Sequence, residues 1–201
     1  MIEVEKKFVL TNEQTKALLD GAQFLIEKRI EDRYFDTSEY VLTTKDWWLR
    51  KRGDRFELKI PLGDNTTRTI DQYRELETDS QIREALGMGT GEDLETDLNR
   101  VGYRMFCHCS TMRKKYLRGE FGIDLDEVRY DEGSTYRLAE IELMVSEDQV
   151  EKANQRIQEF AVQHGLEDRV IRGKVIEYLF RYNLPHYDAL KIAGVLRRGA
   201  G

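Results

Sequence analysis

The sequence predicts an α+β fold in which an eight-stranded antiparallel β-barrel or tunnel carries covering helices. Eight segments have the composition of strands, and several alternate between two kinds of side chain with a period of two. In three of these segments the alternating residues are charged, so one face of the sheet would be lined with charges. Because charges of both signs on an inward face describe a hole and not a packed core, we expect a tunnel.

The expected strands are joined by turns that contain glycine. Arg52-Gly53-Asp54-Arg55 is typical of a hairpin turn, because glycine adopts backbone angles that other residues avoid, and Glu132-Gly133-Ser134 predicts a second turn. In chain order, the strands are expected at residues 2–9, 30–36, 47–52, 55–60, 69–76, 101–115, 117–128 and 136–145.

Helices are expected between and after these strands. Thr11 with Gln14 predicts a capping box and a short helix that stops near Gly21, and Ser146 with Gln149 predicts the start of a longer one. The longer helix ends at Gly165, and its apolar stripe consists of Val150, Ala153, Ile157 and Phe160. The remaining helical segments are 80–100, with a glycine-rich break at 87–89, and a pair at 174–182 and 185–196.

Length and composition bound the class of protein. A chain of 201 residues without a linker rich in Pro, Gly or Ser is expected to form one domain over residues 1–201. Its net charge of -6 argues against nucleic acid as a partner, because binding to a phosphate backbone needs a basic surface. No apolar run approaches the roughly 20 residues of a membrane helix, and the charged N-terminus leaves no room for a signal peptide. We therefore expect a monomeric cytoplasmic protein that binds neither membranes nor nucleic acid.

Charged residues recur at the same alternate positions of several strands. One such motif is more often the solvated face of a sheet, but the whole set is hard to place on the outside by coincidence. Carboxylates hold hard divalent cations, and Lys and Arg bind phosphate oxygens, so the set suits a polyanion that binds together with a metal ion. Its members are Glu3, Glu5, Lys7, Arg50, Arg52, Lys59, Glu75, Arg113, Asp124, Asp126, Glu140 and Glu142.

The two cysteines are expected to be structural. Cys107 and Cys109 would share one strand face with His108 on the other, and no second Cys or His pair completes a zinc site.

The ordered motifs resemble those of the CYTH family, the triphosphate tunnel metalloenzymes. The resemblance runs nearly end to end, and the segment 174–190 favours the subgroup of soluble thiamine triphosphatases over the bacterial adenylate cyclases. The motifs that carry it are Glu3-Val4-Glu5-Lys6-Lys7, Tyr34-Phe35-Asp36-Thr37, Trp48-Leu49-Arg50-Lys51-Arg52, Glu57-Leu58-Lys59, Ile123-Asp124-Leu125-Asp126, Glu140-Ile141-Glu142 and Lys174-Val175-Ile176-Glu177-Tyr178-Leu179.

This resemblance implies an enzyme that hydrolyses the terminal phosphate of thiamine triphosphate with Mg²⁺, or with Mn²⁺ as an alternative. Lys59 with Tyr34 would activate the attacking water, and Trp48 would stack on the thiazolium ring. The residues implied for gripping the triphosphate are Lys7, Arg50, Arg52, Lys59, Arg113 and Lys174. The residues implied for metal binding are Glu3, Glu5, Glu75, Asp124, Glu140 and Glu142, with Asp126 as an alternative to Asp124.

Three other functions share the same grip. An inorganic tripolyphosphatase would differ only in the organic part of its substrate, a nucleotide cyclase would expel pyrophosphate, and a non-catalytic module would bind a polyphosphate without turnover. Lys59 and Tyr34 favour an enzyme over the binding module, because a neutral lysine hydrogen-bonded to a tyrosine can accept a proton from water.

Overall fold

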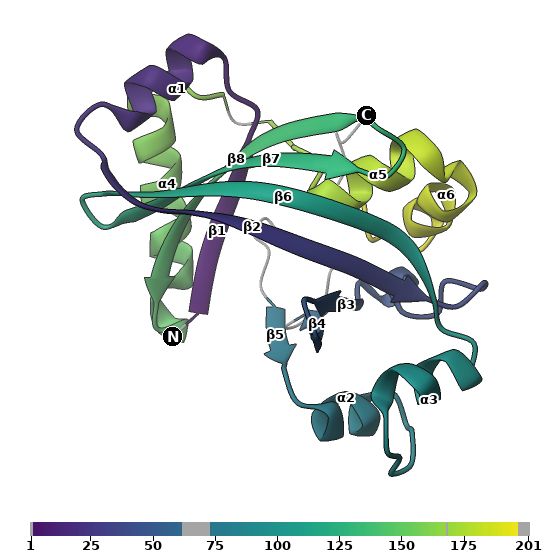
Figure 1. Cartoon of the computed structure of the whole chain (residues 1–201). Coiled ribbons are helices and arrows are strands. Elements are labelled where there is room, and N and C mark those ends of the chain that lie inside the picture. Colours follow the sequence, from purple (N-terminus) through teal and green to yellow (C-terminus); the bar gives the residue numbers. More distant parts are fainter. Residues whose placement is uncertain (1, 62–72, 168, 197–201) are drawn as a thin grey trace.

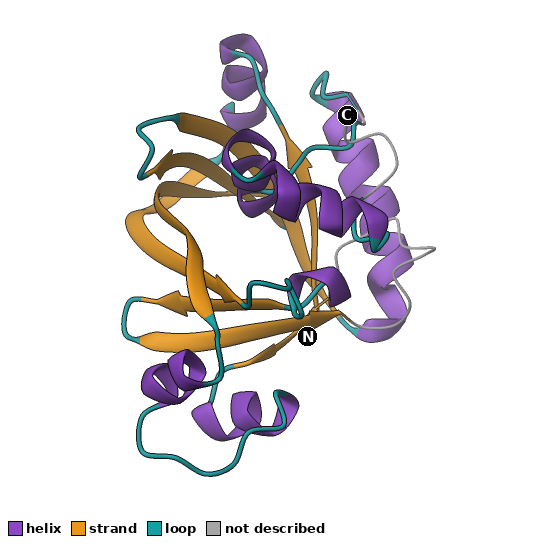
Figure 2. Cartoon of the chain, turned by 90° about the vertical axis from the view of Figure 1, so that its right-hand side faces the viewer, coloured by secondary structure: helices purple, strands orange, loops and turns teal. Residues whose placement is uncertain are grey.

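The computed structural model describes residues 2–61, 73–167 and 169–196, and its centre is one curled sheet. All neighbouring strands are antiparallel, in the order β1-β8-β7-β6-β2-β3-β4-β5. The sheet forms a half-barrel with helices around it (Figures 1 and 2). The predicted fold class is thus confirmed.

The strands are β1 (Ile2–Phe8), β2 (Gln23–Asp36), β3 (Trp48–Arg52), β4 (Arg55–Pro61), β5 (Tyr73–Leu76), β6 (Arg104–Arg118), β7 (Phe121–Tyr130) and β8 (Thr135–Val145). The α-helices are α1 (Asn12–Leu19), α2 (Asp79–Ala85), α3 (Leu94–Arg100), α4 (Val150–Gln163), α5 (Lys174–Tyr182) and α6 (Leu184–Ile192).

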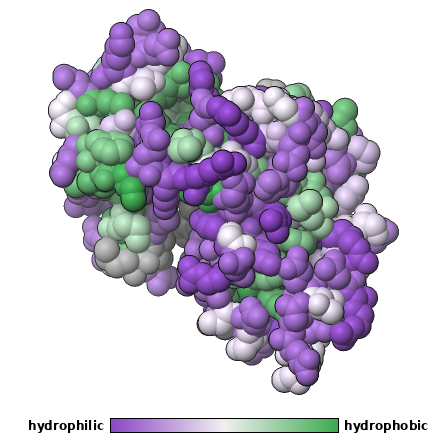
Figure 3. All heavy atoms as spheres, viewed as in Figure 1, coloured by the Kyte–Doolittle hydropathy of each residue, from purple (hydrophilic) through white to green (hydrophobic). Residues whose placement is uncertain are grey.

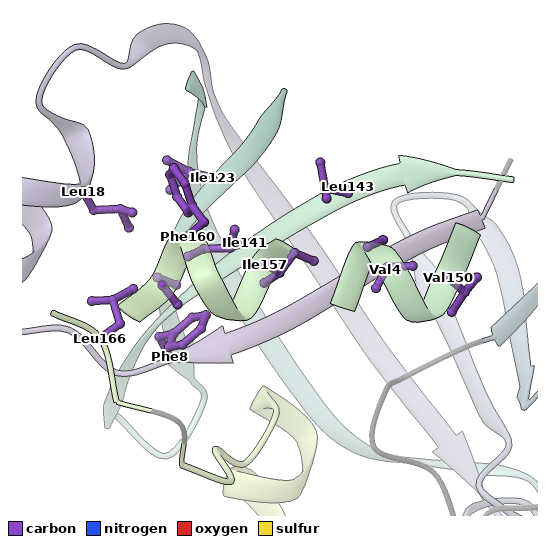
Figure 4. Packing of buried hydrophobic residues seen from close by; sticks show 13 residues of the cluster. Val4, Phe8, Leu18, Ile123, Ile141, Leu143, Val150, Ile157, Phe160 and Leu166 are labelled. Carbon is purple, nitrogen blue, oxygen red and sulfur yellow. The ribbon is translucent and has the colours of Figure 1, made fainter. Parts of the chain in front are cut away.

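Two hydrophobic clusters cover the outer face of the sheet. In the first, the apolar stripe of α4 packs with α1 on β1, β7 and β8, and Figure 4 shows Ile157 and Phe160 facing Val4, Phe8 and Ile141. In the second, α2 and α3 pack on β2, β3, β4 and β5 through residues such as Ile82 and Leu58. The outer face therefore supplies two cores, which leaves the inner face free for polar residues.

A third cluster closes one end of the inner face. Leu179 of α5 and Leu190 of α6 are fully buried there against Tyr34, Cys107 and other side chains of β2, β6, β7 and β8. The hydroxyl of Tyr130 donates to the backbone oxygen of Lys174 at 2.7 Å. The two C-terminal helices thus plug the half-barrel and set Lys174, the first residue of α5, at the inner edge of the plug.

Buried polar contacts attach α6 to the loop between β2 and β3. The Asp36 carboxylate accepts hydrogen bonds from the backbone N–H of Thr43, at 2.8 Å, and from its hydroxyl. The Thr43 hydroxyl oxygen lies 2.6 Å from Nε2 of His186. Because this hydroxyl gives its proton to Asp36, Nε2 of His186 is the donor in the second contact. Burial lowers the pKa of His186 to about 4, so the ring is neutral.

Several predicted boundaries are wrong. β2 begins at Gln23 and not at residue 30. The sequence did not indicate its first seven residues as a strand, because they are exposed and show no alternation. The turn between β6 and β7 lies at Gly119, which has a φ of +60°, and not at residue 116. Ser146 makes no capping hydrogen bond to a helix N–H; its hydroxyl donates to Asp148, and a short 3₁₀ turn precedes α4. Of the strand expected at 69–76, the first four residues lie outside the described ranges.

The other elements agree with the sequence more closely, although β6 begins at Arg104 and not at residue 101, and α6 ends at Ile192 and not at residue 196. The capping box of Thr11 with Gln14 is present, the hairpin turn at Gly53 has a φ of +58°, and α5 has the predicted bounds. Cys107 and Cys109 are buried and form no disulfide bond, with His108 on the opposite face. No helix in the described residues is long and apolar enough to span a membrane. Figure 3 shows a mainly hydrophilic surface, with hydrophobic residues gathered on the side of α1 and α4.

Replacing Ile157 by Ala should lower the free energy of unfolding by about 2–5 kcal/mol, because the side chain is fully buried and leaves a cavity. Val162→Ala on the same helix is the matched control: Val162 is 64% exposed, and we expect a change within about 0.5 kcal/mol. Urea denaturation of both variants measures the difference, and equal stabilities would contradict the packing of α4 on the sheet.

Candidate functional site

The strand register places the predicted charged residues on the inner face. Residues opposite each other in an antiparallel pair share a face, and the alternation within each strand extends that face across the sheet. The register sets a cation against a carboxylate at Lys7↔Glu140, Lys59↔Glu75, Arg50↔Glu57, Asp32↔Arg52, Arg113↔Asp126 and Lys115↔Asp124. Ion pairs between neighbouring strands are therefore built into the topology.

The curl of the sheet brings its two ends toward each other. Glu3 on β1 interacts electrostatically with Lys59 on β4, although β1 is the first strand in the sheet order and β4 the seventh. The inner-face charges therefore face one common region on the concave side of the curled sheet, and the curl itself is visible in the ribbons of Figure 2.

Arg113 forms the centre of the acidic side of this space. Its Nε lies 2.7 Å from Oδ1 of Asp126, its Nη1 2.5 Å from Oδ2 of Asp124, and its Nη2 2.7 Å from Oε2 of Glu140. These carboxylates raise the pKa of Arg113, against the opposing effect of burial, so the guanidinium is permanently charged.

Lys115 and two glutamates extend the acidic side. Nζ of Lys115 lies 2.6 Å from Oε1 of Glu142 and 3.3 Å from Oδ1 of Asp124. Burial and the nearby Glu142 and Glu5 raise the pKa of Glu3 to about 8, so Glu3 holds a proton at neutral pH that it shares with Glu142. Gly122 lies opposite Glu142, and a Cβ there would come within 2.7 Å of the Glu142 side chain, so only glycine leaves room for it.

The basic side of the space consists of ion pairs on β2, β3, β4 and β5. Arg50 binds Glu57 at 2.6 Å, and Lys59 binds Glu75 at 2.6 Å. Fully buried Asp32 accepts hydrogen bonds from Nε and Nη2 of Arg52, at 2.8 and 3.0 Å, and from Nζ of Lys174 at 2.5 Å. Burial opposes the charge on Asp32, but Lys174 and Arg52 hold the pKa of this carboxyl well below its usual range.

The remaining predicted site residues lie on β1 and β2. Lys7 and Glu5 form an ion pair on β1. Tyr34 is buried beside Lys174, Asp32 and Arg50, and burial raises its pKa. No hydrogen bond joins Lys59 to Tyr34 in the described part of the chain, because Lys59 lies against Glu75 and β3 separates their strands.

The two tryptophans at the start of β3 pack into different hydrophobic clusters. The indole N–H of Trp48 donates to Oδ1 of Asp46 at 2.8 Å, and its ring packs against the inner cluster that α5 closes. Trp47 packs against the outer cluster of α2 and α3. Trp48 is thus the tryptophan that belongs to the inner face.

Among the described residues, sequence reasoning missed three charged inner-face residues that pair with the expected ones: Asp32, Glu57 and Lys115. Each lies two positions from an expected residue in the same strand, so extending the period of two from Tyr34, Lys59 and Arg113 would have found them. Without them the ion pairs of the site are not predicted, because they are the partners of Arg52, Arg50 and Glu142.

The donor chemistry of the acidic side fits a hard divalent cation. Carboxylate oxygens are the ligands that Mg²⁺ prefers, and Oδ1 of fully buried Asp124 accepts no hydrogen bond among the described residues. Within those residues, no three acidic, His or Cys side chains lie close enough to hold an ion in their present positions. Arg113 and Lys115 explain this, since both lie between the carboxylates. A metal would require these side chains to move.

Replacing Arg113 by Met should destabilise the protein by about 3–5 kcal/mol at neutral pH, because it leaves buried carboxylates without their partner. Burial already raises the pKa of Asp124 and Arg113 lowers it, so the variant raises this pKa further. A carboxyl with a raised folded-state pKa favours the fold at low pH and loses that effect as pH rises. The deficit should therefore be small near pH 4 and grow toward pH 8.

Arg129→Met is the control, since Arg129 is exposed and pairs with Glu127 on the outer face. It should change stability by less than about 1 kcal/mol at every pH. Denaturant titrations across this pH range test both variants, and a deficit for Arg113→Met that does not change with pH would contradict the buried carboxylate cluster.

The chain resembles proteins of known family. The family model described as the CYTH domain matches residues 1–169. The chain is 30% identical to proteins named thiamine-triphosphatase from Macaca fascicularis and from Homo sapiens, over 94% of this chain and 89% of theirs.

Solved structures show the same fold. A protein from Pyrococcus horikoshii aligns with a TM-score of 0.61 at 22% identity, over 89% of this chain and 98% of its own. A Hippeastrum protein described as a proposed adenylyl cyclase with a dominant triphosphatase activity aligns with a TM-score of 0.56 at 18% identity, over 90% of this chain and 94% of its own. The family that the motifs indicated is confirmed, and the chain belongs to the CYTH family.

Proposed function

We propose that this protein hydrolyses the terminal phosphate of thiamine triphosphate in a reaction that depends on Mg²⁺. The observation that carries the proposal is the inner face itself, where cations from β1, β3, β4, β6 and α5 meet carboxylates from β1, β5, β7 and β8. The relatives named thiamine-triphosphatase support this choice of substrate.

The basic side would bind the triphosphate. Arg50, Arg52 and Lys174 already point to one region around Asp32 and Tyr34. Each is paired with a carboxylate, so substrate phosphates would replace existing partners and not meet bare charges. Arg suits this role, because its planar fork binds two phosphate oxygens at once. Lys7 and Arg113 would bind the triphosphate from the acidic side.

The acidic side would hold the metal through Glu3, Glu5, Glu75, Asp124, Glu140 and Glu142. We favour Asp124 over Asp126, because Asp126 is held by two nitrogens of Arg113 while Oδ1 of Asp124 accepts no hydrogen bond from a described residue. When bound, Mg²⁺ would neutralise charge that develops on the phosphoryl oxygens. The carboxylates would therefore exchange their present lysine and arginine partners for the metal, and those cations would be free to contact the substrate.

Lys59 would accept the proton of the attacking water, with Tyr34 as its hydrogen-bond partner. Lys59 must leave Glu75 to do so, since these two side chains are paired at 2.6 Å in the empty protein. The proposed metal role of Glu75 provides the reason for that release.

Trp48 would stack on the thiazolium ring. Its indole N–H is fixed by Asp46, whose carboxylate also accepts a hydrogen bond from Tyr73 at 2.9 Å. The ring is half-buried, so part of it is open to a cation. The negative charge of Asp46 beside it would favour a cationic ligand further.

Inorganic tripolyphosphatase is the second candidate. The paired cations of the inner face would contact only phosphates, so nothing in their geometry requires an organic group. The deciding experiment compares phosphate release from thiamine triphosphate, tripolyphosphate and ATP with Mg²⁺ and with a chelator. Thiamine triphosphate should be preferred; preference for tripolyphosphate would support the second candidate, pyrophosphate release from ATP a cyclase, and binding without release a non-catalytic module.

Lys59→Arg should lower kcat by about a hundredfold or more, the usual contribution of a general base, and change the affinity for substrate little. Arginine keeps the positive charge but cannot act as a base. Lys51→Arg is the control, because Lys51 faces outward and pairs with Glu95. Steady-state kinetics decide the matter: a rise in KM at constant kcat would make Lys59 a phosphate contact only.

Trp48→Ala should reduce kcat/KM for thiamine triphosphate about five- to thirtyfold, which corresponds to a cation–π contact of about 1–2 kcal/mol. Hydrolysis of tripolyphosphate should hardly change, because that substrate has no ring. Trp47→Ala, on the outer face, should affect both substrates alike. Equal losses for both substrates in Trp48→Ala would show that Trp48 is a packing residue.

A further inference from the structure

Lys115 is an inner-face cation to which the function proposed above gives no contact with substrate or metal. It lies on β6, two residues beyond Arg113, and its side chain is about one third exposed. Its ammonium contacts two carboxylates from different strands: Glu142 of β8 at 2.6 Å, and both oxygens of Asp124 on β7, at 3.3 and 3.4 Å. Both carboxylates belong to the set proposed for the metal.

The acidic side needs a cation at this place when no metal is bound. Asp124 is fully buried and the Glu142 side chain is only 12% exposed, and two such carboxylates repel each other without a counter-charge. Arg113 cannot serve both, because its nitrogens are occupied by Asp126, Glu140 and one oxygen of Asp124. Lys115 therefore supplies the charge that Glu142 and the remaining oxygen of Asp124 would otherwise lack.

We propose that Lys115 is a positioning residue that takes the place of the divalent cation in the metal-free protein and is displaced when the metal binds. The inference rests on the proposed function, because it assumes that Asp124 and Glu142 bind the metal. A lysine suits a temporary role, since its single charge sits on a flexible stem that can swing toward solvent, whereas Arg113 is fixed by three carboxylates.

Competition with Lys115 would weaken the binding of the metal. The metal must compete with a positive charge that already neutralises two of its ligands, so part of its attraction is lost. Lys115 would thus hold the carboxylates in place without metal and set the metal concentration at which the site fills. Removal of Lys115 should lower the stability of the metal-free protein and raise the affinity for the metal. Removal of a merely structural lysine would not raise that affinity.

The test compares wild type with Lys115→Met in thermal unfolding at increasing Mg²⁺, without any triphosphate. Lys115→Met should have a lower Tm without metal, and the Mg²⁺ concentration for half of the stabilisation should fall about tenfold, as expected if one competing charge of about 1.4 kcal/mol is removed. Lys115→Arg keeps the competing positive charge, so the half-stabilising Mg²⁺ concentration should not fall in this variant. Lys114→Met is the matched control, because the neighbouring Lys114 faces outward and pairs with Glu27 at 3.3 Å.

Binding of Mn²⁺, followed by electron paramagnetic resonance, gives a second readout that does not depend on unfolding. A half-saturating metal concentration that is unchanged or raised in Lys115→Met would overturn the proposal. So would a wild-type protein whose Tm does not respond to Mg²⁺. Phosphate release by wild type is measured separately, so hydrolysis without metal stabilisation would refute this role of Lys115 while leaving the triphosphatase function standing. If Lys115→Met does not fold, Lys115→Gln serves in its place.

Discussion

The buried cations of the inner face depend on carboxylates within contact distance. Removing a carboxylate or an ammonium from water costs several kcal/mol, which only a close counter-charge and further hydrogen bonds offset. The strand register provides these partners, because it sets Arg50 opposite Glu57 and Lys59 opposite Glu75. A shift of one residue in either pairing would turn these side chains to the outer face, where Leu49 and Leu58 now pack. Fold and site are thus fixed by the same constraint.

The paired interior also explains how a protein of net charge -6 could attract a polyanion. The inner-face cations are largely shielded from solvent, so their charge is balanced by neighbouring carboxylates. The same carboxylates would also serve as ligands if a metal binds. Substrate and metal would together replace the internal ion pairs, phosphate taking the place of Asp32 beside Arg52, and metal taking the place of Lys115 beside Glu142. The empty protein and the loaded one would then be neutralised equally well, so binding need not leave a buried charge unpaired.

Sequence reasoning reached the fold and most of the inner-face residues because period-two alternation is a local signal. Arg50 and Arg52 show it clearly, with Lys51 pointing outward to Glu95. Asp32 escaped notice because Glu31 and Arg33 are also charged, which hides the alternation. Its contact with Lys174 joins residues 142 positions apart, and no local pattern reports such a pairing. The start of β2 was missed for a related reason, since its exposed residues have no buried side to reveal.

The most direct test of the site is a crystal structure of the protein with tripolyphosphate and Mg²⁺. The phosphates should lie inside the half-barrel with Arg50, Arg52 and Lys174 on their oxygens, and the metal should lie between the phosphates and the carboxylates of β1, β7 and β8. The ion pairs of Arg52 with Asp32 and of Lys115 with Glu142 should be opened. Phosphate bound on the outer face, or inner-face ion pairs that stay as they are in the empty protein, would contradict the assignment of this face to a metal–triphosphate complex.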